Sequence, residues 1–237
     1  MPKIMSTDIT VEQLLGKTDS HITWLSKSIG VHHQMLEKFQ LMQAAAQQDG
    51  IDITIASGFR SFERQLAIWN RKVSGELPVN NLNNQPVDLA TLTPFDQLKA
   101  ILLYSALPGT SRHHWGCDID VYSADALLSS QQLKLELWEY QQAGPFYPLT
   151  CWLDKNASDF GFYRPYQRYQ GGVAAEPWHL SYAPLAKLFL AAFNKVGITE
   201  LAKLLTNSDI QLQTTIVEQL NFITEQYINN ISEFPHG

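Results

Sequence analysis

Apolar and polar residues recur along this chain with two different periods, and these periods predict where helices and strands lie. Between Val31 and Gln48, apolar side chains recur every three or four residues, as they do on the buried face of a helix. These side chains are Met35, Phe39, Met42 and Ala46. Residues 51–55 instead alternate β-branched apolar and polar side chains, which is typical of a half-buried strand. We therefore expect a helix over 31–48 followed by a strand over 51–55.

Further elements are expected downstream. Thr93 followed by Pro94 is typical of a helix start, and Pro108 with Gly109 is typical of the region after a helix end. A short strand is predicted over residues 116–122, where it would carry several polar residues. The other predicted helices cover 126–142, 148–160 and several segments between 185 and 227.

These elements predict a single domain with an α+β fold. A small antiparallel sheet would lie among helices, with helical extensions at both ends. We expect residues 1–50 to form the N-terminal extension, 51–183 the core that carries the chemistry, and 184–237 the C-terminal helices. The C-terminal helices either cover this core or form a dimer contact, so the oligomeric state stays open. Residues 72–93 lack periodicity and predict a long surface loop.

The composition is that of a folded and mildly acidic protein. Hydrophobic residues make up 45% of the chain, and 17 basic residues against 23 acidic ones give a net charge of −6. This balance argues against nucleic acid as the principal partner. The chain has neither an apolar run long enough to span a membrane nor the pattern of a secretion signal. We expect a soluble protein, with the cytoplasm favoured and a periplasmic or exported location left open.

The residues that can bind a metal or move protons are concentrated in two short segments. His113, Asp120 and His179 provide two imidazoles and one carboxylate, which zinc accepts as ligands, and three protein ligands leave a position for water. A bound zinc ion can lower the pKa of water from about 16 to about 7 and can polarise a carbonyl group. The pattern therefore predicts a catalytic site for one Zn²⁺ ion. The two cysteines, Cys117 and Cys151, are too few for a thiolate site, although they can form one disulfide.

Glu176 is the candidate general base. It precedes His179 by three residues and can reach the same water without being a metal ligand. Because residues three apart on a strand face opposite sides, the pairing requires a turn, which Pro177 favours. Glu176 alone would be interpreted as a surface carboxylate, whereas its position beside His179 favours catalysis.

The order of these residues resembles the VanY-like D-alanyl-D-alanine carboxypeptidases. These belong to the LAS zinc peptidases, with the pattern S-x-H-x-x-G-x-A-x-D followed by E-x-x-H, and their fold is also found in L-alanyl-D-glutamate endopeptidases and the hedgehog signalling domain. The resemblance extends roughly from Ile51 to Tyr182. The residues that match are Ser111, His113, Gly116, Asp120, Glu176 and His179, preceded by the segment 57–61 with Arg60.

The resemblance implies a role for each of these residues. The zinc ligands would be His113, Asp120 and His179, and Glu176 would be the catalytic base. Arg60 would bind or polarise the substrate near the scissile carbonyl. The expected substrate-binding residues are Gln65, Ser111, Trp178 and Asp118.

The chain departs from the pattern of this family at two positions. Asp118 stands where the pattern has a small alanine, and Ser181 replaces a basic residue. On a regular strand Asp118 shares a face with Asp120, so it either supports a metal ligand from behind or shifts the substrate preference. His114 has no place in the pattern and is expected to pack or to support the site. Cys117 is expected to be a small buried apolar residue.

The function implied is zinc-dependent hydrolysis of the terminal D-alanyl-D-alanine bond in peptidoglycan stem peptides or precursors. The partner would be a stem peptide or a muropeptide. Two alternatives remain open: a peptidoglycan endopeptidase or L,D-carboxypeptidase of the same fold, and a zinc-binding module without catalysis. His21, His32 and His33 lie outside the two segments and are expected to be core or surface residues.

Overall fold

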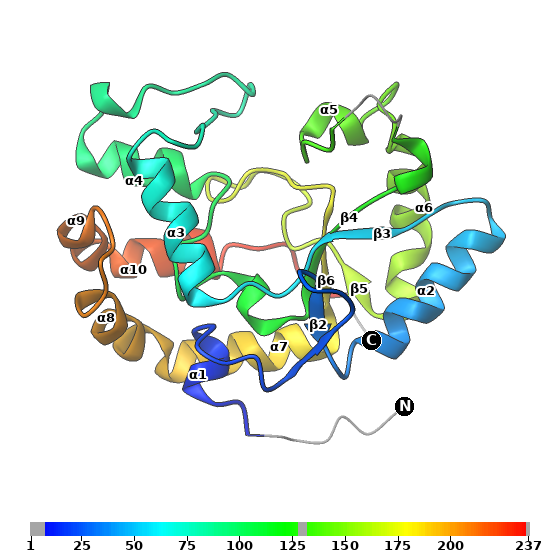
Figure 1. Cartoon of the computed structure of the whole chain (residues 1–237), viewed down its shortest axis with the longest axis horizontal. Coiled ribbons are helices and arrows are strands. Elements are labelled where there is room, and N and C mark those ends of the chain that lie inside the picture. Colours follow the sequence, from blue (N-terminus) through cyan, green and yellow to red (C-terminus); the bar gives the residue numbers. More distant parts are fainter. Residues whose placement is uncertain (1–7, 128–131, 236–237) are drawn as a thin grey trace.

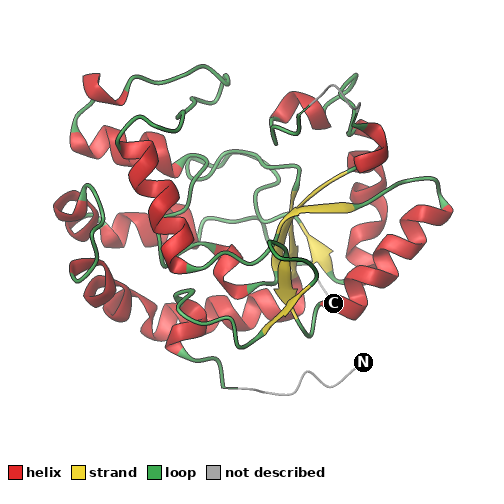
Figure 2. Cartoon of the chain, viewed as in Figure 1, coloured by secondary structure: helices red, strands yellow, loops and turns green. Residues whose placement is uncertain are grey.

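A four-stranded antiparallel sheet lies at the centre of the computed structural model, which describes residues 8–127 and 132–235. Its strands follow the order β3-β4-β6-β5, and helices surround it (Figures 1 and 2). The strands are β3 (Thr54–Ser57), β4 (Asp118–Tyr122), β5 (Phe162–Tyr163) and β6 (His179–Tyr182). The predicted α+β class, with a small antiparallel sheet among helices, is confirmed.

The N-terminal segment contains a β-hairpin as well as helices. Helix α1 (Val11–Leu14) precedes the hairpin of β1 (Ile22–Trp24) and β2 (Gly30–His32), and helix α2 (Leu36–Gln48) follows. The helix predicted over 31–48 is therefore wrong at its start, because the backbone of its first two residues pairs with β1. The four periodic apolar side chains are nonetheless all buried, as expected.

Two capped helices follow the first central strand. Helix α3 (Phe62–Val73) begins after Ser61, and helix α4 (Pro94–Leu102) begins after Thr93; each capping hydroxyl accepts a hydrogen bond from a backbone N–H of the first turn. The predicted helix start at Thr93 and Pro94 is confirmed. Between the two helices the chain is mostly irregular, as predicted for 72–93, with one 3₁₀ turn at Leu89–Thr91.

The helix predicted over 126–142 is wrong in its described part. Residues 132–136 are not helical, Leu135 has a φ of 56°, and helix α5 covers only Leu137–Tyr140; residues 128–131 lie outside the described part of the chain. A leucine in the left-handed region interrupts a helix. Helix α6 (Tyr147–Asn156) continues into a 3₁₀ turn at Ala157–Phe160 that ends at Gly161, close to the prediction over 148–160.

The C-terminal helices cover the core. They are α7 (Ala183–Ala192), α8 (Ile198–Thr206), α9 (Gln213–Glu218) and α10 (Leu220–Ile223), with π-helical turns at Phe193–Gly197 and Thr224–Ile228. In Figure 1 the orange and red helices lie next to α3 and α4, and the indole N–H of Trp69 in α3 donates to Gln211 O at 3.1 Å. Leu201, Leu205 and Ile216 are buried in the main apolar core. These helices therefore cover the core, as one of the two expectations for them held.

None of the described helices combines the length and apolar character needed to cross a lipid bilayer.

Candidate active site

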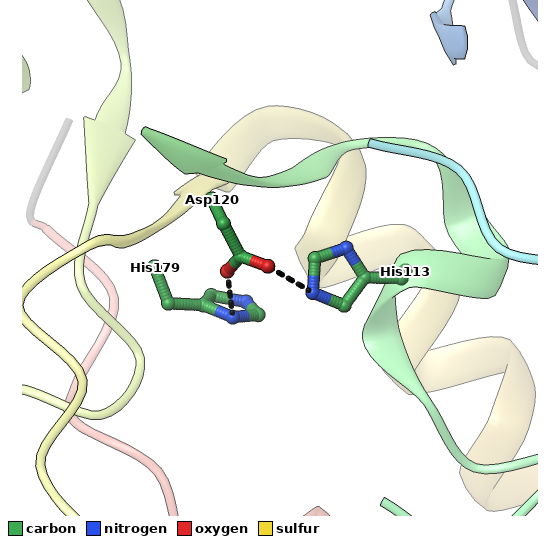
Figure 3. Close-up of side chains that lie close together, drawn as sticks. All are labelled: His113, Asp120 and His179. Atoms are coloured by element: carbon green, nitrogen blue, oxygen red, sulfur yellow. Dashed lines mark ion pairs between the residues drawn. The ribbon is translucent and has the colours of Figure 1, made fainter. Parts of the chain in front are cut away.

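Three elements bring His113, Asp120 and His179 together (Figure 3). His113 lies on a 3₁₀ turn at Arg112–Trp115, Asp120 lies in β4, and His179 is the first residue of β6. Asp120 is paired directly with His179 across the two strands, so their side chains lie next to each other on one face of the sheet. The sheet register therefore places two of the three predicted ligands.

The donor atoms of these residues converge. Asp120 Oδ2 lies 3.4 Å from His113 Nε2, and Asp120 Oδ1 lies 3.3 Å from His179 Nδ1. All three residues are buried, and one donor atom from each lies within 4.8 Å of the others. In the described part of the chain, no other group of three His, Cys, Asp or Glu residues meets this condition.

Hydrogen bonds on the outer side of each ring leave the inner nitrogens available. His113 Nδ1 donates to Gly58 O at 2.9 Å, and His179 Nε2 donates to Asp118 Oδ1 at 3.0 Å. Among the described residues, the buried Oδ1 atom of Asp120 has no hydrogen-bond partner. A cation can satisfy a buried carboxylate whose two oxygens each face one imidazole nitrogen, so these side chains fit a metal ion.

The electrostatics of the site favour a positive charge at its centre. Burial opposes protonation of His179, but the hydrogen bond to Asp118 and the nearby carboxylates of Asp120 and Glu176 outweigh it and raise its pKa well above the usual value. Burial lowers the pKa of His113 to about 3, so this ring is neutral, as a ligand must be. For Asp120, burial opposes ionisation, yet the neighbouring histidines and Arg60 bring its pKa below the usual value.

Glu176 lies in a tight turn, and its carboxylate approaches His179 Nδ1, the nitrogen that Asp120 also approaches. Its Oε2 lies 3.4 Å from His179 Nδ1, and His179 N donates to Glu176 O at 3.1 Å, which closes a turn around Pro177. The turn expected from Pro177 is therefore present. Burial raises the pKa of Glu176, and the neighbouring His179 and Arg60 oppose this increase. A buried carboxylate with a raised pKa is suited to accept and return a proton.

Arg60 follows β3, where a bulge between Ile55 and Ser57 shifts the strand register. Its Nη1 donates to Gln65 Oε1 at 2.9 Å and its Nη2 donates to Ser57 Oγ at 3.1 Å. Within the described structure, the buried Nε of Arg60 has no partner. The guanidinium is thus held by two hydrogen bonds, and its Nε–H is left unpaired among the described residues.

The four predicted substrate-binding residues lie in different surroundings. Gln65 is fully buried, and its Nε2 donates to Ala106 O at 2.7 Å, so its amide holds Arg60 in place. Ser111 is buried at the start of the turn that carries His113. Trp178 packs against Tyr140, with ring centroids 5.5 Å apart, in a small apolar cluster.

Asp118 lies behind His179 and is fully buried. The strand alternation expected from the sequence places it on the face of Asp120, where it bonds the outer nitrogen of His179. Of the two interpretations left open for Asp118, this geometry favours support of a ligand over contact with substrate. Arg112 lowers the pKa of Asp118 to about 2 in spite of its burial.

His114 and Cys117 were expected to have packing or supporting roles, and their contacts agree with this expectation. His114 Nδ1 donates to Arg60 O at 2.5 Å and His114 Nε2 accepts from Gly109 N at 3.0 Å, so this ring braces the loop of Arg60, as expected. Cys117 is buried, and both it and Cys151 are free thiols, so the disulfide that the sequence left open is not formed.

Two residues at this site, Arg112 and Lys72, were not predicted from the sequence. Arg112 forms an ion pair with Asp118; burial lowers the pKa of Lys72, and the charge of Glu176 opposes this decrease. The ring centroids of Tyr166 and His179 lie 5.1 Å apart. An aspartate in a buried strand requires a cation nearby, and this requirement points to Arg112. Lys72 lies seven residues after Gln65, on the same face of α3, which is the pattern that reveals it.

Two buried histidines and an aspartate, with a further buried carboxylate at the same ring nitrogen, form the kind of site found in metal-dependent hydrolases. A family model described as VanY: D-alanyl-D-alanine carboxypeptidase matches residues 28–185, more than half of the chain. The chain therefore belongs to the VanY family of D-alanyl-D-alanine carboxypeptidases, and the expected family and enzyme class are confirmed.

Individual proteins are similar to parts of this chain in sequence or in fold. An uncharacterised protein of Haemophilus influenzae is 41% identical over 90 residues, which cover 37% of this chain and 69% of that protein. A D-alanyl-D-alanine carboxypeptidase of Enterococcus faecalis is 30% identical over 141 residues, covering 58% of this chain and 42% of the relative. The solved structure of VanYB in complex with D-alanine-D-alanine shares the fold, with a TM-score of 0.51 and 24% identity over 74% of this chain and 86% of that one.

Proposed function

We propose that this protein is a zinc-dependent D,D-carboxypeptidase that removes the terminal D-alanine from peptidoglycan stem peptides. The observation that supports this most directly is the convergence of Asp120 and Glu176 on one nitrogen of His179, at 3.3 and 3.4 Å. A metal ligand and a general base are thereby brought to one point. The name of the Enterococcus faecalis relative and the D-alanine-D-alanine bound to VanYB support the choice of substrate.

The residues around the site divide the chemistry among them. His113, Asp120 and His179 would hold the zinc ion, which when bound would act as a Lewis acid toward water and the scissile carbonyl. Glu176 takes the proton from the attacking water and returns it to the leaving amine, the nitrogen of the released D-alanine. The free Nε donor of Arg60 stabilises the negative charge that develops on the carbonyl oxygen.

The experiment that tests this function compares two glutamate variants on a synthetic stem pentapeptide ending in D-alanyl-D-alanine. We expect Glu176→Gln to keep one zinc per chain and to lose about 10²- to 10⁴-fold in kcat, because it removes the proton carrier and leaves the ligands. Glu218→Gln changes an exposed glutamate at the end of α9 and serves as the control. Metal analysis and mass spectrometry of the products provide the two measurements.

Four outcomes would contradict the proposal. Full activity of Glu176→Gln would exclude Glu176 as the base. Internal cleavage of cross-linked stem peptides without D-alanine release would indicate an endopeptidase, and release of D-alanine only from tetrapeptides would indicate an L,D-carboxypeptidase. Tight zinc binding without cleavage of any stem peptide would indicate a binding module.

A further inference from the structure

Arg112 and Asp118 form a buried ion pair directly behind His179. Arg112 Nε donates to Asp118 Oδ1 at 2.7 Å, and the two side chains are 2% and 0% exposed. The same oxygen accepts a hydrogen bond from His179 Nε2 at 3.0 Å. A single carboxylate oxygen therefore links the guanidinium to the imidazole of the metal site.

The guanidinium of Arg112 is itself held on several sides. Its Nη2 donates to Ser181 Oγ at 2.7 Å and to the hydroxyl of Tyr163 at 3.1 Å, and the group lies 4.8 Å from the centroid of the Trp115 ring. Ser181 is paired with Asp118 across β4 and β6, so the sheet register places both partners of Arg112. Because a guanidinium stays charged and presents its donors in a rigid plane, it holds Asp118 in one orientation.

The two departures from the family pattern meet in this network. Asp118 replaces a small alanine, Ser181 replaces a basic residue, and Arg112 bonds both. An alanine at position 118 has no side-chain acceptor for His179 Nε2. Asp118 thus accepts a hydrogen bond from His179 that an alanine at this position could not accept.

We propose that Asp118 is a positioning residue for the metal ligand His179 and that Arg112 holds Asp118 in place. The hydrogen bond to Nε2 fixes the ring orientation and keeps the proton on the outer nitrogen, so that Nδ1 presents its lone pair to the site. The competing explanation is that the ion pair stabilises only the fold. The inference rests on the metal site of the proposed function, but it does not depend on which peptide bond is cut.

The test separates these explanations with a single and a double variant. Asp118→Ala leaves Arg112 as a buried unpaired cation, whereas Arg112→Met combined with Asp118→Ala removes both charges and restores an uncharged interior. We expect both proteins to bind zinc about 10- to 100-fold more weakly than the wild type. We expect the midpoint of thermal unfolding to fall in the single variant and to recover in the double variant. Asp125→Ala, at an exposed aspartate beyond β4, is the control and keeps the wild-type affinity.

Zinc affinity is measured by titrating the metal-free protein with zinc chloride in competition with a chromophoric chelator. A double variant with wild-type zinc affinity would overturn the proposal, because the ion pair would then serve only the fold. A wild-type protein that binds no zinc would instead contradict the proposed function. The two failures are therefore distinguishable without an activity assay.

A second measurement uses only the wild-type protein, so its result does not depend on whether a variant folds. In zinc-loaded protein labelled with ¹⁵N-histidine, NMR correlation spectra identify which ring nitrogen carries the proton. We expect His179 to keep its proton on Nε2 and to bind the metal through Nδ1. A proton on Nδ1 would contradict the proposal.

Discussion

Histidines gather in two regions of this molecule, and their ring geometry alone does not distinguish them. In the N-terminal region His32 lies between His21 and His33, with ring centroids 5.5 and 4.7 Å away. In the active site His113 and His179 have centroids 4.9 Å apart. Close histidine rings are therefore a poor criterion for a metal site.

The partners of the ring nitrogens separate the two regions. His21 Nε2 bonds His114 O at 3.1 Å and His33 Nδ1 bonds His21 O at 2.9 Å. Within residues 8–127 and 132–235, no carboxylate lies at ion-pair distance from any of the three N-terminal rings, whereas three carboxylates surround His179. Carboxylates attract a cation, while backbone partners in a buried setting keep a ring neutral. The acidic neighbours, more than the histidines, define the metal site.

The largest effect expected from this comparison is on metal content. His113→Ala removes a metal-site imidazole and should abolish stoichiometric zinc binding and reduce peptidase activity by at least about 10³-fold, because metal and Lewis acid are lost together. His33→Ala, in the N-terminal region, should retain one zinc per chain and wild-type activity. Metal analysis after dialysis and a D-alanine release assay measure both. Loss of zinc in both variants would remove the distinction between the regions.

A smaller effect is expected where the two regions touch. A Cβ atom on Gly58 would lie 2.2 Å from Gly30 O of β2, so the backbone must move to accept it. Gly58→Ala should lower the free energy of unfolding by about 1–3 kcal/mol. It should also weaken zinc binding, because Gly58 O accepts the hydrogen bond that orients His113.

Urea unfolding and zinc titration measure these two quantities. Gly50→Ala is the control for zinc binding, since a Cβ at Gly50 would meet open space. Unchanged zinc affinity in Gly58→Ala would mean that the N-terminal hairpin and the metal site are not coupled.

The effect that is smallest at neutral pH concerns the titration of His32. Burial lowers the pKa of His32 from 6.5 to about 3, so between these pH values the unfolded chain binds a proton at this ring and the folded chain does not. The contribution of the neutral buried ring to the free energy of unfolding is fully present above pH 6.5. It is lost as the pH falls towards 3, by at most about 1.4 kcal/mol per pH unit. His32→Asn removes the titrating ring and keeps an acceptor for the backbone N–H of Gln34.

We therefore expect the stability difference between wild type and His32→Asn to change between pH 6.5 and 4 in metal-free protein. Urea unfolding at several pH values gives this difference, and the exposed His33→Ala is the matched control. Parallel pH profiles of the wild type and His32→Asn would show that His32 is already solvated in the folded protein.

Parts of the candidate site were predictable because some of its determinants are local. Alternation on a strand placed Asp118 and Asp120 on one face, and Pro177 indicated the turn that brings Glu176 to His179. The contacts of Arg112 were not predictable in the same way. Its bonds to Tyr163 and Ser181 depend on sheet pairing that brings together residues 51 and 69 positions apart, which no local period encodes.

The fold was predictable to a different extent in different segments. Helix α4 has a capping threonine and a proline at its start, so its beginning could be predicted. The hairpin β1-β2 was missed because Val31, four residues before Met35, extends an apolar period that fits a helix equally well. Residues 132–136 were misassigned for a related reason, since the backbone conformation of Leu135 is decided by packing and not by its helix propensity.

The β1-β2 hairpin makes the active site depend on a part of the chain that contributes no proposed catalytic group. Gly30 O accepts the N–H of Phe59 at 2.7 Å, and His32 N donates to Gly116 O at 2.8 Å. The hairpin therefore forms backbone hydrogen bonds both with the loop that carries Arg60 and with the end of the turn that carries His113. Consequently, a fragment that retains these two hydrogen bonds must begin before Gly30. A fragment that begins at Ile51 would keep all the proposed reactive groups but would lose the hydrogen bonds that align them.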